Sequence, residues 1–199
     1  MITALLLIFD PSRTWQRIME AKRGVPFVLL LFLLPTIALT CGAEGWLVQK
    51  FGADDSALER KVAVAPALAI RYAATQAVLA LLVVIAGTLV VQKVADNFHG
   101  YHTFRECFSV VAYGYSPCLL LRVLDGAPTI NTWICWSLGI ILAVGALYQG
   151  LPRMLRPDPA KALGLYMACS VVLTVISGLG HFVAVMVIEE KLFANGFGF

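Results

Sequence analysis

The chain has 199 residues, of which 60% are hydrophobic and only 14% are charged. Soluble domains carry about a quarter charged residues, so this composition excludes a water-soluble fold, and the length suggests a single domain. The net charge of +3 is small and its basic residues are scattered, which argues against nucleic-acid binding.

The first 24 residues predict a short amphipathic helix lying at the membrane interface. Asp10 is a good N-cap, Pro11 suits the first helical position, and Gly24 suits the stop. Three apolar side chains share one face at helical spacing: Trp15, Ile18 and Met19.

Five long apolar windows follow, and a bilayer-spanning helix needs about 20 such residues. The predicted spans are residues 25–43, 72–92, 107–122, 130–151 and 162–188. The third is the shortest, because its uncharged part rises only about 22 Å against a core of about 30 Å. Two features can make up the difference: Arg122 can snorkel at its end, and the helix can extend in both directions. The predicted fold class is therefore an all-α transmembrane bundle of five helices preceded by an interfacial helix.

The polar stretch between the first two spans contains a capping-box pattern from Ser56 to Glu59. This pattern predicts a helix that starts at Ala57 and runs through Pro66 into the second span. Residues 57–71 then form a surface helix, a re-entrant segment or part of the second span.

Prolines and ionisable residues inside the spans are the first candidates for function. Pro117 should kink the third span and free the carbonyl of Tyr113, which Tyr115, Ser116 or a neighbouring helix can satisfy. His181 is expected near the far interface. No Asp or Glu lies near the middle of a span, which argues against proton-coupled transport and catalysis, so we predict no catalytic residue and no cofactor.

The best metal-like group is His99, His102 and Glu106, which share one face if residues 97–107 are helical. The alternative is a polar helix with its histidines at the level of the headgroups. A fourth ligand is missing and Gly100 disfavours the helix, so we do not expect a metal site.

Basic residues predict the orientation of the chain. With the N-terminus in the cytoplasm, nine basic residues lie on that side and six on the other. We therefore expect a multi-pass protein of a bacterial inner membrane, with its N-terminus inside and its C-terminus outside.

Three sequence patches carry a family resemblance. The first is FDP at residues 9–11 with Trp15 and Ile18, the second is FHGYHTFR at 98–105 followed by Tyr113 and Pro117, and the third is YQGLP at 148–152. Their order on a five-span layout resembles the Yip family of Ypt/Rab-interacting membrane proteins. The resemblance implies a five-helix bundle with a cytosolic N-terminus, and it carries over to these positions: Pro11, Gly100, Phe104, Tyr113, Pro117, Gly150 and Pro152.

Eukaryotic members of that family are linked to Rab GTPases and have a substantial hydrophilic N-terminal region. Only 24 residues precede the first predicted span here, which is typical of a short bacterial member and argues against Rab binding. We expect a non-enzymatic protein that organises membrane or recruits partners, which include the lipid bilayer, other membrane proteins or a second copy of the chain. The alternative is a small-solute channel or transporter acting as an oligomer, its path lined by Tyr113 and Tyr115 beside Pro117.

Overall fold

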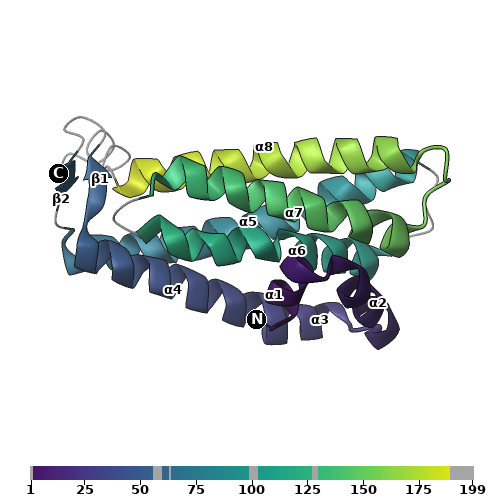
Figure 1. Ribbon diagram of the computed structural model, residues 1–199, viewed down its shortest axis with the longest axis horizontal. Coiled ribbons are helices and arrows are strands. Elements are labelled where there is room, and N and C mark those ends of the chain that lie inside the picture. The colour runs from purple at the N-terminus through teal and green to yellow at the C-terminus, as the bar shows by residue number, and fades with distance from the viewer. Residues whose placement is uncertain (1, 56–59, 63, 99–102, 127–129, 189–199) are drawn as a thin grey trace.

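The computed structural model describes residues 2–55, 60–62, 64–98, 103–126 and 130–188. Five long helices run side by side along the molecule (Figure 1). Their bounds are Val25–Phe51, Pro66–Asn97 (α5), Phe104–Gly126, Thr132–Leu155 (α7) and Ala162–Ile188 (α8). Even the shortest, with 23 residues, rises about 34 Å and can cross a bilayer core of about 30 Å. The predicted five-helix membrane bundle is thereby confirmed.

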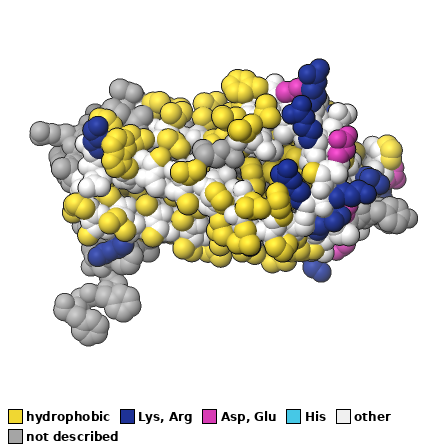
Figure 2. Space-filling model, turned by 90° about the horizontal axis from the view of Figure 1, so that it is seen from below, with side chains coloured by type: hydrophobic (Ala, Val, Ile, Leu, Met, Phe, Trp, Pro, Cys, Tyr) yellow, Lys and Arg dark blue, Asp and Glu magenta, His cyan; other side chains and the backbone are white. Residues whose placement is uncertain are grey.

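Lipid-facing surface accounts for much of the apolar composition. Large hydrophobic side chains stay exposed along the outer faces of the helices, among them Leu31, Leu82, Ile141, Leu163 and Leu179. Figure 2 shows hydrophobic side chains over the middle of one face and Lys and Arg gathered toward one end. This is the pattern of a protein that uses the bilayer as solvent around its middle and water at its ends.

The third span is the most enclosed helix of the bundle. It consists of α6 (Phe104–Leu121) and a 3₁₀ segment, η2 (Arg122–Gly126), and every residue from 107 to 119 is buried. It contacts α7, α5 and α4, and Figure 1 places it among them. The apolar window 107–122 is short because a helix enclosed by other helices does not need a long run of apolar residues that face lipid.

The first span is longer than the sequence window 25–43 suggested. It begins with α3 (Val25–Val28), passes through a π-helical segment, η1 (Leu29–Leu33), and continues as α4 (Leu34–Phe51). The π-helical segment ends two residues before Pro35, which has no amide hydrogen to donate. The helix also continues past Glu44, because this side chain is fully buried inside the bundle rather than exposed to lipid.

The segment between the first two spans departs from the predicted helix. Gly52 ends α4 with a φ of 85°, and a short antiparallel pair follows, β1 (Ala53–Asp55) with β2 (Arg60–Val62). The expectation of a helix running from Ala57 through Pro66 is therefore wrong. Helix α5 begins at Pro66, in the first-turn position that proline favours, so residues 66–71 belong to the second span. The residues of the capping-box pattern, 56–59, lie outside the described residues.

Two helices precede the first span, α1 (Ile2–Phe9) and α2 (Pro11–Ala21). The predicted start of α2 is confirmed, because the Asp10 side chain accepts a hydrogen bond from the amide of Arg13 at 3.3 Å and Pro11 opens the helix. Its end differs. Lys22 closes the helix in a left-handed conformation, and Gly24 instead precedes α3 as its N-cap.

The apolar face of α2 packs on helix α7. Trp15 is fully buried, and its indole Nε1 donates to the carbonyl of Ala146 at 2.9 Å. A β-carbon at Gly150 would collide with the indole ring, so glycine is needed there for the close approach. The Ser12 hydroxyl adds a bond of 2.7 Å to Gln149 Oε1. Helix α2 is thus held to the bundle by its apolar face.

Pro117 lies inside α6, as expected from the sequence. The Tyr113 carbonyl cannot receive an amide hydrogen from residue 117, and it accepts one from the Ser116 hydroxyl at 2.6 Å instead. Ser116 is one of the partners that the sequence predicted for this carbonyl. The helix therefore keeps the freed carbonyl satisfied in a buried environment.

We expect Trp15→Ala to lower the free energy of unfolding by about 3 kcal/mol, because it leaves a cavity against Gly150 and removes the bond to Ala146. Thermal unfolding in detergent measures this change, and limited proteolysis detects the released α2. Trp46, which is 58% exposed on α4, supplies the control: Trp46→Ala should cost about 1 kcal/mol or less. Equal losses from both substitutions would contradict the docking of α2.

Ser116→Ala should destabilise the protein by about 1–2 kcal/mol, because it leaves the buried Tyr113 carbonyl without its partner. Adding Pro117→Ala should recover part of that loss, since residue 117 then has an amide hydrogen to donate. Denaturation of the single and double variants measures the coupling. Thr88→Val is the control, because the hydroxyl that it removes bonds Val84, whose carbonyl keeps its helical partner. Purely additive effects would overturn this role of Ser116.

Candidate functional site

A cluster of buried polar side chains joins three spans near the end of the bundle opposite α2. Glu44 comes from α4, Tyr72 and Gln76 come from α5, and Arg122 opens η2. The Tyr72 hydroxyl donates to Glu44 Oε1 at 2.5 Å, and Gln76 Nε2 donates to the same oxygen at 3.3 Å. Arg122 Nε lies 3.8 Å from Glu44 Oε2, and both side chains are at most 5% exposed. We call these four residues the buried charge cluster.

The tight turn after α6 brings the arginine into the bundle. Helix α6 narrows into the 3₁₀ segment η2 at Arg122, and Gly126 at its end lies against Leu47 and the Glu44 carbonyl of α4. A β-carbon at position 126 would collide with the Leu47 side chain and come within 3.2 Å of the Glu44 carbonyl oxygen. Asp125, on the same turn, interacts electrostatically with Arg122 and Glu44. The prediction that Arg122 snorkels to the interface is wrong, because its charge is neutralised inside the protein.

The buried charge cluster links helices. Two charges that lose their hydrating water in a low-dielectric interior are stable only if they pair with each other and accept or donate further hydrogen bonds. Glu44 meets this need with Arg122, Tyr72 and Gln76 around it. An oxygen of Glu44 and two nitrogens of Arg122 have no hydrogen-bond partner among the described residues. The arrangement therefore depends on direct ionic attraction between α4 and η2, supported by α5.

His181 lies at the same end of the bundle, as its position late in the fifth span predicted. It is 2% exposed and stacks on Trp136, with ring centroids 5.9 Å apart, and Trp133 meets it edge-on at 4.8 Å. Its Nε2 is 3.5 Å from the Thr132 hydroxyl. The histidine thus belongs to an aromatic contact between α8 and the start of α7.

The continuous helix that the metal-like group would need is interrupted at Thr103. Helix α5 ends at Asn97, and Thr103 has an extended backbone as the N-cap of α6, so no continuous helix joins residues 97–107. Glu106 instead caps α6, because its Oε2 accepts from the Thr103 amide at 2.7 Å. His99 and His102 lie outside the described residues, and within the part of the chain that is described no group of three His, Cys, Asp or Glu side chains could hold a metal ion.

The first and third sequence patches meet in space, although their residues lie at least 130 positions apart. Pro11 opens α2, whose Trp15 packs against Gly150, and Pro152 lies one turn short of the end of α7. The separation of Trp15 from its hydrogen-bond partner Ala146 is 131 residues. These two patches therefore form one contact, the docking of α2 on α7.

The second patch contributes the start and the core of α6. Phe104 is its first residue, with its ring 6.3 Å from that of Phe108, and Tyr113 packs against Phe32 at 4.3 Å between ring centroids. Tyr115 bonds Ser177 of α8 at 3.0 Å. Both tyrosines are 1% exposed, so they fill helix contacts beside Pro117. Gly100 lies outside the described residues.

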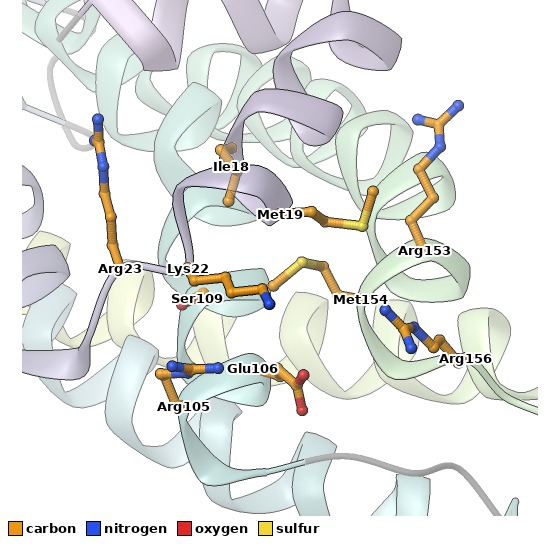
Figure 3. A pocket seen from close by; sticks show the side chains of 10 residues that line it. All are labelled: Ile18, Met19, Lys22, Arg23, Arg105, Glu106, Ser109, Arg153, Met154 and Arg156. Atoms are coloured by element: carbon orange, nitrogen blue, oxygen red, sulfur yellow. The ribbon is translucent and has the colours of Figure 1, made fainter.

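A basic pocket opens at the other end of the bundle, between the end of α2, the start of α6 and the end of α7. Its volume is about 80 Å³. In Figure 3 the side chains of Lys22, Arg105 and Arg156 extend toward the same hollow, while Arg153 and Arg23 turn away from it. The lining residues are Ile18, Met19, Lys22, Arg23, Arg105, Glu106, Ser109, Arg153, Met154 and Arg156.

The sequence model of the Yip1 domain matches residues 5–182, which include α2, the motif patches and all five spans except the last turns of α8. The chain belongs to the Yip1 domain family. The resemblance seen in the three patches is confirmed by this match. No curated protein and no solved structure matches the chain.

Parts of the buried charge cluster can be recognised in the sequence, although a search for uncharged windows misses them. Glu44 is followed by the apolar residues Trp46, Leu47 and Val48, which are typical of a helix that continues beyond the charge. Tyr72 and Gln76 lie four residues apart, on one face of the next span. No local pattern indicates that Arg122 is the partner of Glu44.

We expect Arg122→Met alone to lower the free energy of unfolding by about 3–5 kcal/mol, because it leaves the Glu44 carboxylate buried without its cation. The double variant Glu44→Gln, Arg122→Met should lose much less, since no uncompensated charge remains. Thermal unfolding in lipid nanodiscs provides the comparison, with Arg17→Met on the exposed face of α2 as control. A double variant that is as unstable as the sum of the single ones would exclude direct pairing.

Proposed function

We propose that this Yip1-family chain is a non-enzymatic membrane protein that organises membrane or recruits partners at the end of the bundle that carries α2. The observation behind this proposal is the separation of its charges. Glu44 and Arg122 are buried against each other in helix contacts, whereas nine of the 15 basic residues gather in segments at the α2 end. Buried charges thus support packing, and exposed charges support contact with other molecules.

The charge distribution also supports an orientation with the α2 end in the cytoplasm. The nine basic residues of that end come from the chain before α3, from around the α5–α6 connection and from around the α7–α8 connection. Figure 2 shows this gathering at one end of the molecule. Under the positive-inside rule the N-terminus is cytoplasmic and the C-terminus external, as in a bacterial inner membrane protein.

The surroundings of Pro117 favour packing over a solute path. A path would need the two nearby tyrosines to face open space, but Tyr113 lies against Phe32 and the Tyr115 hydroxyl bonds Ser177. The Ser116 hydroxyl is used by the Tyr113 carbonyl. These contacts support the structural role of the kink, and so they support the recruitment proposal over a channel.

The exposed face of α2 is the part of this end that a partner meets first. Arg13, Gln16, Arg17 and Glu20 are exposed, while the opposite side of the helix is held by α7. We propose that the partner that meets this face is another membrane protein or a second copy of the chain.

Photo-crosslinking residues placed at Gln16 and Glu20 in intact cells should form a discrete adduct, identified by mass spectrometry as a membrane protein or a second copy. The variant Arg13→Gln, Arg17→Gln should lose that adduct if the exposed charges attract the partner. Crosslinkers at Leu138 and Ile141, exposed on α7, are the control and should not give the same adduct. Adducts that form equally well in the charge variant, or no adducts at all, would count against recruitment by α2.

A further inference from the structure

Two residues of the basic pocket share an unusual backbone conformation. Lys22 has a φ of 41° and Arg156 a φ of 45°, and they are the non-glycine residues with positive φ in the described part of the chain. Each closes a helix, α2 or α7, at a position where glycine is usually favoured. A charged side chain is not needed to end a helix at either position, and both side chains line the same pocket.

The third cation comes from a different element. Arg105 lies in the first turn of α6, so the three positive charges reach the pocket from three separate helices. The other two arginines are engaged elsewhere: Arg153 bonds Gln149 and Ser12, and the guanidinium of Arg23 lies over the ring of Phe27. Only the convergence of Lys22, Arg105 and Arg156 therefore needs an explanation.

The three cations outnumber the acidic side chains that line the pocket. Glu106 is the acidic residue among those that line it, and its Oε2 is already bonded by the amide and the hydroxyl of Thr103 at 2.7 and 3.0 Å. Among the described residues no carboxylate forms an ion pair with Lys22, Arg105 or Arg156. Three converging cations beside one carboxylate leave an excess of positive charge, so the arrangement favours an external anion.

The size and chemistry of the pocket select the anion. A volume of about 80 Å³ accommodates a group equivalent to a few water molecules, which suits a phosphate group. Arginine and lysine from several directions match the several acceptor oxygens of phosphate. The buried Ser109 and the side chains of Met19 and Met154 complete a pocket with a polar and an apolar side.

The position of the pocket identifies the source of the phosphate. Directly after Arg23 the chain enters the first span, where Phe27, Leu30 and Leu31 are 40%, 59% and 66% exposed on the lipid-facing side. The pocket therefore lies at the level where headgroups meet water, and basic residues there attract anionic lipids. We infer that Lys22, Arg105 and Arg156 bind the phosphate of an anionic phospholipid headgroup. This inference rests on the proposed function, because it assigns a ligand to the same basic end.

The substitutions Lys22→Gly and Arg156→Gly test the inference without straining the fold, because glycine favours both backbone conformations. Native mass spectrometry of the full chain in detergent measures binding of phosphatidylglycerol against phosphatidylcholine with the same acyl chains. The double glycine variant should melt no lower than the natural protein, yet lose about 30-fold in affinity for phosphatidylglycerol, from the usual contribution of two basic residues at a lipid surface.

The matched control is Arg13→Gln, Arg17→Gln, which removes the same charge from the exposed face of α2. It should change phosphatidylglycerol binding by no more than about twofold, because screened exposed charges contribute little. An equal loss of phosphatidylglycerol affinity in both double variants, or no preference of the natural protein for phosphatidylglycerol, would overturn lipid binding in the pocket. Inorganic phosphate that binds the natural protein as tightly as the lipid does, and fails to bind the glycine variant, would overturn the lipid as the source.

These variants separate the inference from the proposed function. Loss of phosphatidylglycerol binding in Lys22→Gly, Arg156→Gly, together with absent adducts at Gln16 and Glu20, would support the lipid pocket and overturn partner recruitment by α2. Adducts at those positions with no lipid preference in the natural protein would support recruitment and overturn the lipid pocket.

Discussion

The bundle depends on the need to satisfy every polar group that enters its apolar interior. Glu44 is the sharpest case, because a carboxylate in the first span is tolerated only with Arg122, Tyr72 and Gln76 around it. That contact fixes where η2 turns, holds α4 against α5, and makes Gly126 necessary where the turn meets α4. The Ser116 hydroxyl on the carbonyl of Tyr113 meets the same need at the proline kink.

The two ends of the molecule use charge in opposite ways. At the end opposite α2, Glu44 and Arg122 are enclosed and serve helix packing. At the α2 end the basic side chains stay at the surface, and the docking of Trp15 on Gly150 holds the end of α2 beside the end of α7. The Yip1 patches that contain these residues therefore hold in place the helix ends that carry Lys22 and Arg156, which connects the family pattern with the proposed surface for partners and lipid.

Local sequence patterns predicted the structure correctly where the contact that determines it joins residues only a few positions apart. Asp10 and Pro11 start α2 as expected, and Ser116 satisfies the carbonyl that Pro117 frees. Predictions failed where a distant contact decided the outcome. Glu44 looked like the end of a span and Arg122 like a snorkelling residue, because a window of one sequence segment assumes that lipid or water surrounds each side chain. For α6 the surroundings are other helices, so its short apolar run understated its length.

The sequence by itself determined the fold class, the number of spans, the start of α2 and the Yip1 family, because helix length, capping and apolar composition are properties of neighbouring residues. Tertiary structure alone decided which charges are buried and which converge. Glu44 meets Arg122, and Trp15 meets Ala146 across 131 residues, only after the helices have packed. Lys22, Arg105 and Arg156 likewise form one pocket because three helix ends come together, an arrangement that no single segment of the chain encodes.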